Sequence, residues 1–262
     1  MGAVEPLTYS SYLALDQILS AQHPRSDEPD ELLFITIHQV YELWFKQVLH
    51  EVDRLGQHLD AGDGPRCLDT LKRILTILKV AVAQVDVLET MTPRQFTGFR
   101  ARLEAASGFQ SAQFRQLEAA LGRREQTMLR PYPEGSRERA AIAARMVAPP
   151  VFDRFCRYLA GRGFAVPGSV LDRDPAQPYT GSAQVEDLLV EVYAADGPEA
   201  QIAERLVDLD EGLQEWRYRH VKMVQRTIGD KGGTGGSSGA RYLQGTLFTP
   251  VFPDLWAVRR RL

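Results

Sequence analysis

The chain has 262 residues, 44% of them hydrophobic, and its charges nearly cancel at a formal net charge of −3. This length can bury a substantial core, and the balanced charge argues against nucleic acid or an anionic membrane surface as a partner. Cys67 and Cys156 lie far apart and match no CxxC or CxxCH pattern, which argues against a zinc ribbon, a thioredoxin-type motif and c-type haem attachment. The first residues lack a signal-peptide pattern, and no apolar run approaches the ~20 residues of a membrane span, so we expect a soluble cytoplasmic protein.

Residues 1–30 are predicted to form an arm of connecting or capping material. Tyr9, Tyr12 and Leu13 precede a short helical pattern over 15–20, and a polar stretch with two prolines follows. These apolar side chains have no obvious partner nearby in the sequence. Such an arm often docks onto another part of the chain or onto a second subunit.

A long helix is predicted to begin at Asp30, which is a credible N-cap with the acidic Glu31 in the first turn. Two adjoining apolar stripes run along this helix, so we expect it to be buried around much of its circumference. One stripe contains Leu33, Ile37, Val40, Trp44, Val48, Val52 and Leu55, and the other contains Phe34, His38, Tyr41 and Phe45. An imidazole without a partner on such an aromatic face is costly. His38 therefore needs a backbone carbonyl, another side chain or a bound ligand.

The rest of the chain also has helical periodicity, and no segment is a convincing strand or an internal repeat. We therefore predict an all-α fold, a single domain of long helices over residues 1–262. The expected helices span about 65–90, 93 to a break at 107–111, 111–122, 136–147, 150–160, 182–195 and 198–228, with one more short helix within 240–262.

The helix predicted to begin at residue 93 carries a candidate ligand-binding residue. Thr92 is predicted to cap it and Pro93 to take its first position. Arg100 follows on the same helix, shortly before the Ser-Gly break. It is either an ordinary solvated surface charge or a bidentate clamp for a substrate carboxylate.

The helix over 198–228 carries His220 and leads into a glycine-rich loop. Residues 231–239 contain five glycines, one threonine and two serines, a composition that lets a backbone wrap closely around a ligand. His220 can therefore bind a metal or cofactor while the glycine-rich loop closes over the bound group. The alternatives are a satisfied core or surface histidine and a plain linker.

Several well-known catalytic motifs are missing. We find no P-loop, HExxH, GxSxG or complete GxGxxG pattern. Hydrolysis by paired carboxylates stays open, although the acidic residues mostly lie on predicted helix surfaces. His38 and Glu42, at i and i+4, could belong to a non-haem metal site, but no third ligand is evident. A large flat cofactor held by a single histidine between long helices fits what remains, and haem b needs only one protein ligand.

Four motifs, in chain order, resemble the tryptophan 2,3-dioxygenase family. They are FITIHQVYELWFK at 34–46, Phe99-Arg100 with SGFQS at 107–111, WRYRH at 216–220 and GTGGSSG at 233–239. The similarity runs from about Leu7 to the end and is weakest through 123–200. It implies an all-helical, haem-dependent homotetramer that inserts both atoms of O₂ across the indole C2–C3 bond of L-tryptophan, giving N-formyl-L-kynurenine.

The resemblance also implies roles for individual residues. His220 matches the proximal iron ligand, and His38 matches the distal histidine that accepts a hydrogen bond from the indole N–H. Arg100 matches the arginine that pairs with the substrate carboxylate, and Thr234 matches the threonine that closes over the ammonium and carboxylate groups. The other implied contacts are Phe34 and Phe96 on the substrate, Ser107 and Trp44 on the haem, and Tyr9, Tyr12 and Leu13 in an arm that reaches a neighbouring subunit's pocket.

Phe96 stands where some bacterial members of the family carry a tyrosine whose hydroxyl contacts the substrate carboxylate. Other members have phenylalanine there, so this difference implies a lost hydrogen bond of about 1 kcal/mol and no loss of activity.

Two alternative functions follow from the same scaffold. A monooxygenating relative would add one oxygen to tryptophan or to a methylated tryptophan in natural-product biosynthesis. The sequence does not separate this from dioxygenation, because the cofactor carries that chemistry. A haem sensor or carrier without turnover would keep His220 but would need no amino-acid clamp.

Overall fold

The computed structural model describes residues 6–104, 106, 108–229, 244–245 and 247–262. Every regular element within these ranges is a helix, which confirms the all-α prediction. The α-helices are α1 (Tyr9–Leu13), α2 (Leu15–Leu19), α3 (Asp30–Asp60), α4 (Gly64–Leu88), α5 (Pro93–Arg100), α6 (Ala112–Leu121), α7 (Arg137–Val147), α8 (Val151–Gly161), α9 (Gly168–Leu171), α10 (Ala183–Ala195), α11 (Pro198–Ile228) and α13 (Pro253–Ala257). Short 3-10 helices are η1 (Ala101–Leu103), η2 (Gly108–Gln110), η3 (Gln126–Leu129) and η4 (Val258–Arg261).

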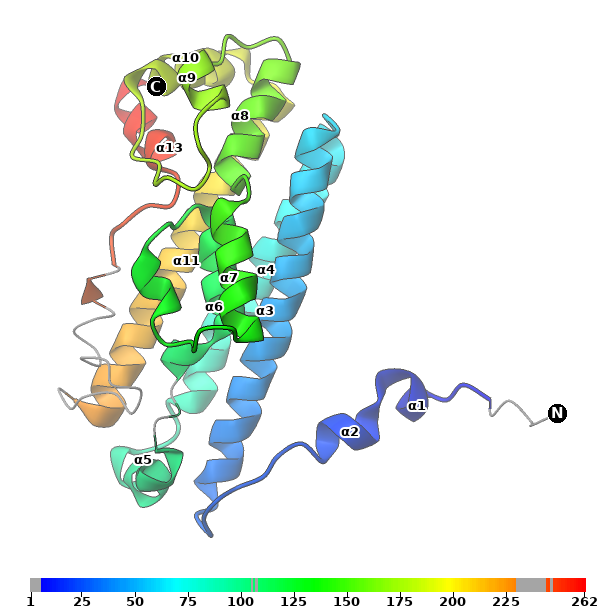
Figure 1. The fold of residues 1–262 in the computed structure, drawn as a ribbon, viewed down its shortest axis with the longest axis vertical. Helices are drawn as coiled ribbons and strands as arrows, with labels where there is room; N and C mark the ends of the chain where they lie inside the picture. Colours follow the sequence, from blue (N-terminus) through cyan, green and yellow to red (C-terminus); the bar gives the residue numbers. More distant parts are fainter. Residues whose placement is uncertain (1–5, 105, 107, 230–243, 246) are drawn as a thin grey trace.

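Three long helices determine the shape of the molecule. In Figure 1, α3, α4 and α11 run along the long axis, α6 and α7 lie against them, and α8, α9, α10 and α13 gather at one end. Helix α5 lies at the other end. Both α3 and α11 pack against α4, so α4 is the common neighbour of the two helices that carry the predicted histidines. Among the described residues, no helix is long and apolar enough to cross a membrane.

Helix α3 begins at Asp30, as predicted, but its N-cap differs from the prediction by one residue. Pro29, not Asp30, is the N-cap, and no side chain caps this helix. The buried carboxylate of Glu31 instead accepts hydrogen bonds from the backbone N–H groups of Arg25 (2.9 Å) and Ser26 (2.8 Å). The prediction about Asp30 was wrong because the acidic residue after it ties down the preceding turn. The caps of α5 follow the prediction, since the Thr92 hydroxyl accepts from the N–H of Gln95.

The interior contains two main clusters at opposite ends of the three long helices. The larger cluster is mostly aliphatic and includes Val48, Val52, Leu55 and Leu59 of α3, Leu71 and Ile74 of α4, and Leu206 and Leu213 of α11. The second, which we call the aromatic cluster, includes Ile37, Tyr41 and Phe45 of α3, Phe96 and Phe99 of α5, and Met223 of α11, with Phe34, Phe114 and Trp216 packed against them. Helix α3 therefore runs antiparallel to both α4 and α11.

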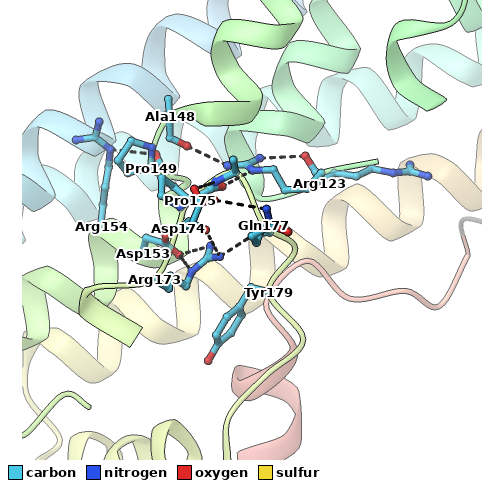
Figure 2. A network of polar contacts seen from close by, with 12 residues as sticks. Arg123, Ala148, Pro149, Asp153, Arg154, Arg173, Asp174, Pro175, Gln177 and Tyr179 are labelled. Carbon is cyan, nitrogen blue, oxygen red and sulfur yellow. Dashed lines mark hydrogen bonds and ion pairs between the residues drawn. The ribbon is translucent and has the colours of Figure 1, made fainter. Parts of the chain in front are cut away.

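A polar network fixes the connection between α8 and α10, which lies between the predicted helices 150–160 and 182–195 and is rich in proline, glycine and aspartate. Arg173 donates to the buried carboxylate of Asp153 (3.0 and 2.7 Å) and to the carbonyl of Gln177 (2.9 Å), as Figure 2 shows. Arg124 donates to the carbonyl of Pro175 in the same segment (2.6 Å). The loop is thus held in one conformation without a regular helix or strand over most of its length.

The amino-terminal arm stands away from the bundle in Figure 1. Helices α1 and α2 expose most of their apolar side chains, and Tyr9 and Tyr12 are 75% and 72% exposed. The arm is tied to α3 only near its end, where Gln22 donates to Gln39 (2.6 Å) and Gln39 donates to the carbonyl of Ala21 (3.0 Å). Within the described chain, therefore, the apolar face of this arm is not part of either cluster.

Candidate active site

The aromatic rings of the aromatic cluster come from α3, α5, α6 and α11. Phe34 of α3 lies 5.8 Å from Phe96 and 5.5 Å from Phe99, measured between ring centroids, and these two rings of α5 meet edge to face at 5.4 Å. The indole of Trp216 on α11 lies 5.9 Å from the ring of Phe45 on α3 and 4.6 Å from that of Phe114 on α6. Edge-to-face and tilted arrangements of this kind are favourable for aromatic rings. Both predicted histidines lie among these rings.

His38 is held in a defined orientation by its own helix. Its Nδ1 lies 2.7 Å from the carbonyl oxygen of Phe34, and the two rings are 4.1 Å apart. A carbonyl can only accept, so Nδ1 carries the proton and Nε2 keeps its lone pair in the neutral ring. Burial lowers the pKa of His38, against the Phe34 hydrogen bond and the charge of Glu42. His38 is therefore a neutral hydrogen-bond acceptor at pH 7.

The space beside Nε2 of His38 is bordered by a residue without a side chain. A β-carbon placed on Gly108 would lie 3.7 Å from both Nε2 and Cδ2 of His38. That is an ordinary van der Waals distance, so an alanine would fit the protein but would occupy the region next to the acceptor nitrogen. Gly108 leaves this region open to a donor from a ligand.

The turn of α3 that carries His38 is fastened to α4 by two reciprocal hydrogen bonds. Gln84 of α4 donates to the carbonyl of Ile37 (3.0 Å), and the hydroxyl of Tyr41 donates to the carbonyl of Ala81 (2.9 Å). Each bond joins a side chain of one helix to the backbone of the other. They fix the register of α3 against α4 on both sides of His38.

His220 lies on α11, one turn after Trp216, and the two rings stack at 5.1 Å with 21° between their planes. Burial, together with the nearby His38, lowers the pKa of His220 to about 4. Its imidazole is therefore neutral at pH 7, the form that can donate a lone pair to a metal. Trp216 also brings a buried Nε1–H that has no hydrogen-bond partner in the described part of the chain.

The available donors fit a cofactor that brings its own ligands. Across the described residues, no group of three or more histidine, cysteine, aspartate or glutamate side chains could hold a metal ion, so the pair His38 and Glu42 gains no third ligand there. A single neutral imidazole among aromatic rings suits the iron of a haem, whose porphyrin supplies four nitrogen ligands. His220 therefore fits the axial position, and the unpartnered N–H of Trp216 suits a polar edge of such a group.

Some of the other predicted site residues lie beside the aromatic cluster, and others do not. Phe96 is buried beside Phe34, and Arg100 follows one turn later, half-buried in the last turn of α5. Trp44 packs against the larger aliphatic cluster and not the aromatic one, so its role as a haem contact stays a prediction. Ser107 and Thr234 lie outside the described residues. Tyr9, Tyr12 and Leu13 lie in the exposed arm, away from the histidines.

Three residues of the site were not assigned from the sequence. The stacking of Trp216 on His220 has a sequence signal, because residues four apart on a helix are neighbours. Phe114 and Gly108 have no such signal. Their contacts depend on how α6 and the segment before it meet α11 and α3, which periodicity does not report.

An open polar cavity of about 640 Å³ lies at α5, and it is separate from this site. Its lining includes Arg25, Glu28, Gly98 and Arg102 and none of the predicted site residues. Gly98 lies on the side of α5 away from the buried Phe96 and Phe99. The cavity is therefore no part of the histidine site.

The fold and the site together define an all-α protein with two buried, neutral histidines in an aromatic cluster, a site that fits a histidine-bound cofactor. A sequence model of the family described as "Tryptophan 2,3-dioxygenase" matches residues 2–140 and 162–262. The chain belongs to the tryptophan 2,3-dioxygenase family.

Named relatives cover almost the whole chain. A tryptophan 2,3-dioxygenase of Anaeromyxobacter sp. (strain K) is 66% identical over 98% of this chain and 96% of its own length. One from Herpetosiphon aurantiacus is 53% identical over 98% of this chain and 99% of its own, and one from Caulobacter vibrioides is 43% identical over the same shares. The resemblance predicted from the four motifs is confirmed.

Proposed function

We propose that this chain catalyses the haem-dependent oxidation of L-tryptophan by O₂, cleaving the indole C2–C3 bond to give N-formyl-L-kynurenine. The observation that carries the proposal is that His38 and His220, from helices that both pack on α4, lie in one aromatic cluster and are both neutral at pH 7. Names of relatives at 53–66% identity support the same reaction.

His220 would be the axial ligand of a haem b. When bound, the haem supplies the iron that activates O₂, a chemistry that amino-acid side chains lack. The stacked indole of Trp216 restricts the orientation of the imidazole relative to its own helix, α11. The low pKa of His220 keeps its lone pair available throughout the physiological range.

His38 would orient the substrate by accepting a hydrogen bond from the indole N–H at its Nε2. The Phe34 carbonyl fixes the required tautomer, and Gly108 leaves room beside the nitrogen. The indole N–H is too weak an acid for imidazole to deprotonate easily, so His38 need not act as a full base. Phe34 and Phe96 provide an apolar wall for the indole ring.

Arg100 would pair with the carboxylate of the amino acid. It lies four residues after Phe96, and this spacing places both on one side of α5, toward Phe34. A guanidinium can bind a carboxylate through two parallel hydrogen bonds, which fixes orientation as well as charge. Thr234 would add a contact to the ammonium and carboxylate groups, and Ser107 a contact at the haem edge.

The arm would complete the site of a second copy in a homotetramer. Its exposed Tyr9, Tyr12 and Leu13 support this proposal, because side chains of this kind are normally covered. Deleting residues 1–20 should lower the number of subunits per assembly, measured from the mass in solution, and raise the KM for tryptophan. An unchanged number of subunits and an unchanged KM would contradict the role of the arm.

The test of the proposed function is the mass of the product that the reduced protein forms from L-tryptophan under ¹⁸O-labelled O₂. We expect two labelled oxygens in a ring-opened product. One labelled oxygen on an intact ring would establish monooxygenation instead, and retention of haem without any product would indicate a sensor or carrier.

A further inference from the structure

A buried carboxylate on α6 collects three arginines next to the helix that carries His220. Glu118 accepts from Arg115 (2.5 Å), from Arg123 (2.8 Å) and from Arg217 of α11 (2.9 Å). Glu118, Arg115 and Arg217 are all more than nine-tenths buried. Burial by itself raises the pKa of the Glu118 carboxyl, but the three guanidinium groups bring it below its ordinary value, so the group is charged. Buried charges of this kind add little net stability, but they can specify one arrangement of helices.

The ion pair of Glu118 with Arg217 joins α6 to α11. The same two helices also meet where Phe114 packs on Trp216, with ring centroids 4.6 Å apart. Phe114 and Glu118 lie one turn apart on α6, while Trp216 and Arg217 are consecutive on α11 and point about 100° apart around its axis. Two contacts in different directions around a helix oppose its rotation, and the hydrogen bonds of the ion pair are directional, whereas ring packing is not.

The rotation of α11 determines where His220 points. His220 lies three residues after Arg217 and four after Trp216, and its ring is stacked on the indole of Trp216. A turn of α11 about its axis would carry Trp216 and His220 round together. The stacking alone therefore does not fix the direction of the imidazole relative to α3 and α6.

We propose that Glu118 and Arg217 are positioning residues that fix the rotation of α11 and thereby the direction in which His220 presents its nitrogen to the haem iron. This inference rests on the proposed axial role of His220. Neither residue touches the reacting atoms, and they act through His220 alone.

The chain offers a matched pair of variants. Arg217→Met removes the tether from α11 and leaves Glu118 with Arg115 and Arg123, so no carboxylate is stranded in the interior. Arg123→Met removes the other donor to the same Glu118 oxygen, but Arg123 follows α6 and has no part in α11. Both variants lose one donor to the same oxygen of Glu118, and Arg123→Met also loses two hydrogen bonds to the exposed Glu125. Only Arg217→Met removes a contact of the helix that carries His220. Arg217→Lys keeps the charge and restores one donor.

The experiment measures the iron–histidine stretching band of the reduced holoprotein by resonance Raman, and the rate of haem transfer to apomyoglobin. For Arg217→Met we expect a shifted, broadened band and about tenfold faster haem loss, and for Arg217→Lys a partial recovery of both. For Arg123→Met we expect an unchanged band and a rate of haem loss within about twofold of the parent protein.

Equal effects of Arg217→Met and Arg123→Met, or a lower melting temperature of Arg217→Met with an unchanged band, would overturn the positioning role and leave the axial role intact. Absence of an iron–histidine band in the parent protein, or its persistence in His220→Ala, would overturn the axial role and this inference with it.

Discussion

The two ends of the three long helices have different chemistry. At one end, α3, α4 and α11 contribute leucine, isoleucine and valine side chains that are almost completely buried and carry no polar atoms. At the other end, α3 and α11 contribute tyrosine, phenylalanine, tryptophan and histidine, several of them only partly buried, and α4 contributes Ala81, Val85 and Leu88. The aliphatic end is a closed core, and the aromatic end has the neutral nitrogen atoms and open faces that a bound group requires.

The difference teaches that a continuous helix can serve stability and function in separate stretches. On α11 the change occurs between Leu213, which is 1% exposed, and Trp216, which lies in the aromatic cluster. Replacements on the two sides of this boundary should therefore affect different measurable quantities.

The largest expected effect is that of His220→Ala. Loss of the only proposed axial ligand should weaken haem retention by about 100-fold or more. The measurement is the Soret absorbance of protein purified with added haemin. The matched variant is Leu206→Ala, in the aliphatic part of α11, which should lower the free energy of unfolding by about 2–5 kcal/mol and leave the haem spectrum of the folded protein unchanged. Full haem retention in His220→Ala with an unaltered spectrum would contradict the assignment.

Arg100→Ala should have the next largest effect. Removing one partner of the carboxylate pair should weaken tryptophan binding by about 2–4 kcal/mol, with the haem spectrum nearly unchanged. Equilibrium titration with tryptophan measures this directly. Arg102→Ala, an exposed arginine two residues further on, should leave the affinity as it is. Equal affinities of Arg100→Ala and the parent protein would remove the clamp from the proposal.

His38 should make the reaction sensitive to acid. Burial lowers its pKa, so His38 is neutral at pH 7 and becomes protonated only below the ordinary pKa of histidine. Protonated Nε2 would be a donor and could no longer accept from the indole, so kcat/KM for tryptophan should fall as the pH drops through this lowered pKa. His38→Ala should cost up to about tenfold at pH 7 and remove this acid limb. His50→Ala, an exposed histidine on the aliphatic half of α3, should retain it. An unchanged limb in His38→Ala would assign it to another group.

Phe96→Tyr should have the smallest effect. A hydroxyl that reaches the substrate carboxylate would add about 1 kcal/mol of binding, which lowers the KM for tryptophan by about fivefold. Phe99→Tyr places the same hydroxyl on a fully buried ring, where it should lower the free energy of unfolding by about 1–3 kcal/mol and leave the KM alone. An identical response of both variants would show that Phe96 is a core residue only.

Much of this organisation was predictable from local sequence. The apolar spacing of α3, α4 and α11 marked the long helices, and Thr92 with Pro93 marked the start of α5, because these signals act within one or two turns. The stripe that grouped Trp44 with Val48 and Val52 already placed it with the aliphatic core, where the structure has it. The haem contact that the resemblance implies for Trp44 stays a prediction.

What the sequence could not provide is the meeting of helices distant in the chain. Phe114 contacts Trp216, and Glu118 pairs with Arg217, across about a hundred residues. Neither pair has a pattern that a single sequence reveals, since each depends on how α6 lies against α11. The predicted N-cap of α3 was wrong for a related reason. Glu31 accepts hydrogen bonds from the turn before the helix, and no local capping rule predicts that contact.

Arg124 affects how the protein unfolds locally. Its guanidinium donates to the carbonyls of Ala119 (2.5 Å), Arg123 (2.9 Å), Ala148 (2.9 Å) and Pro175 (2.6 Å). One side chain thus joins the ends of α6 and α7 to the loop before α10. Its acceptors are backbone atoms, so no single substitution at those positions deletes them. The three segments form one cooperative unit, and their amides should exchange with solvent deuterium together and not one after another.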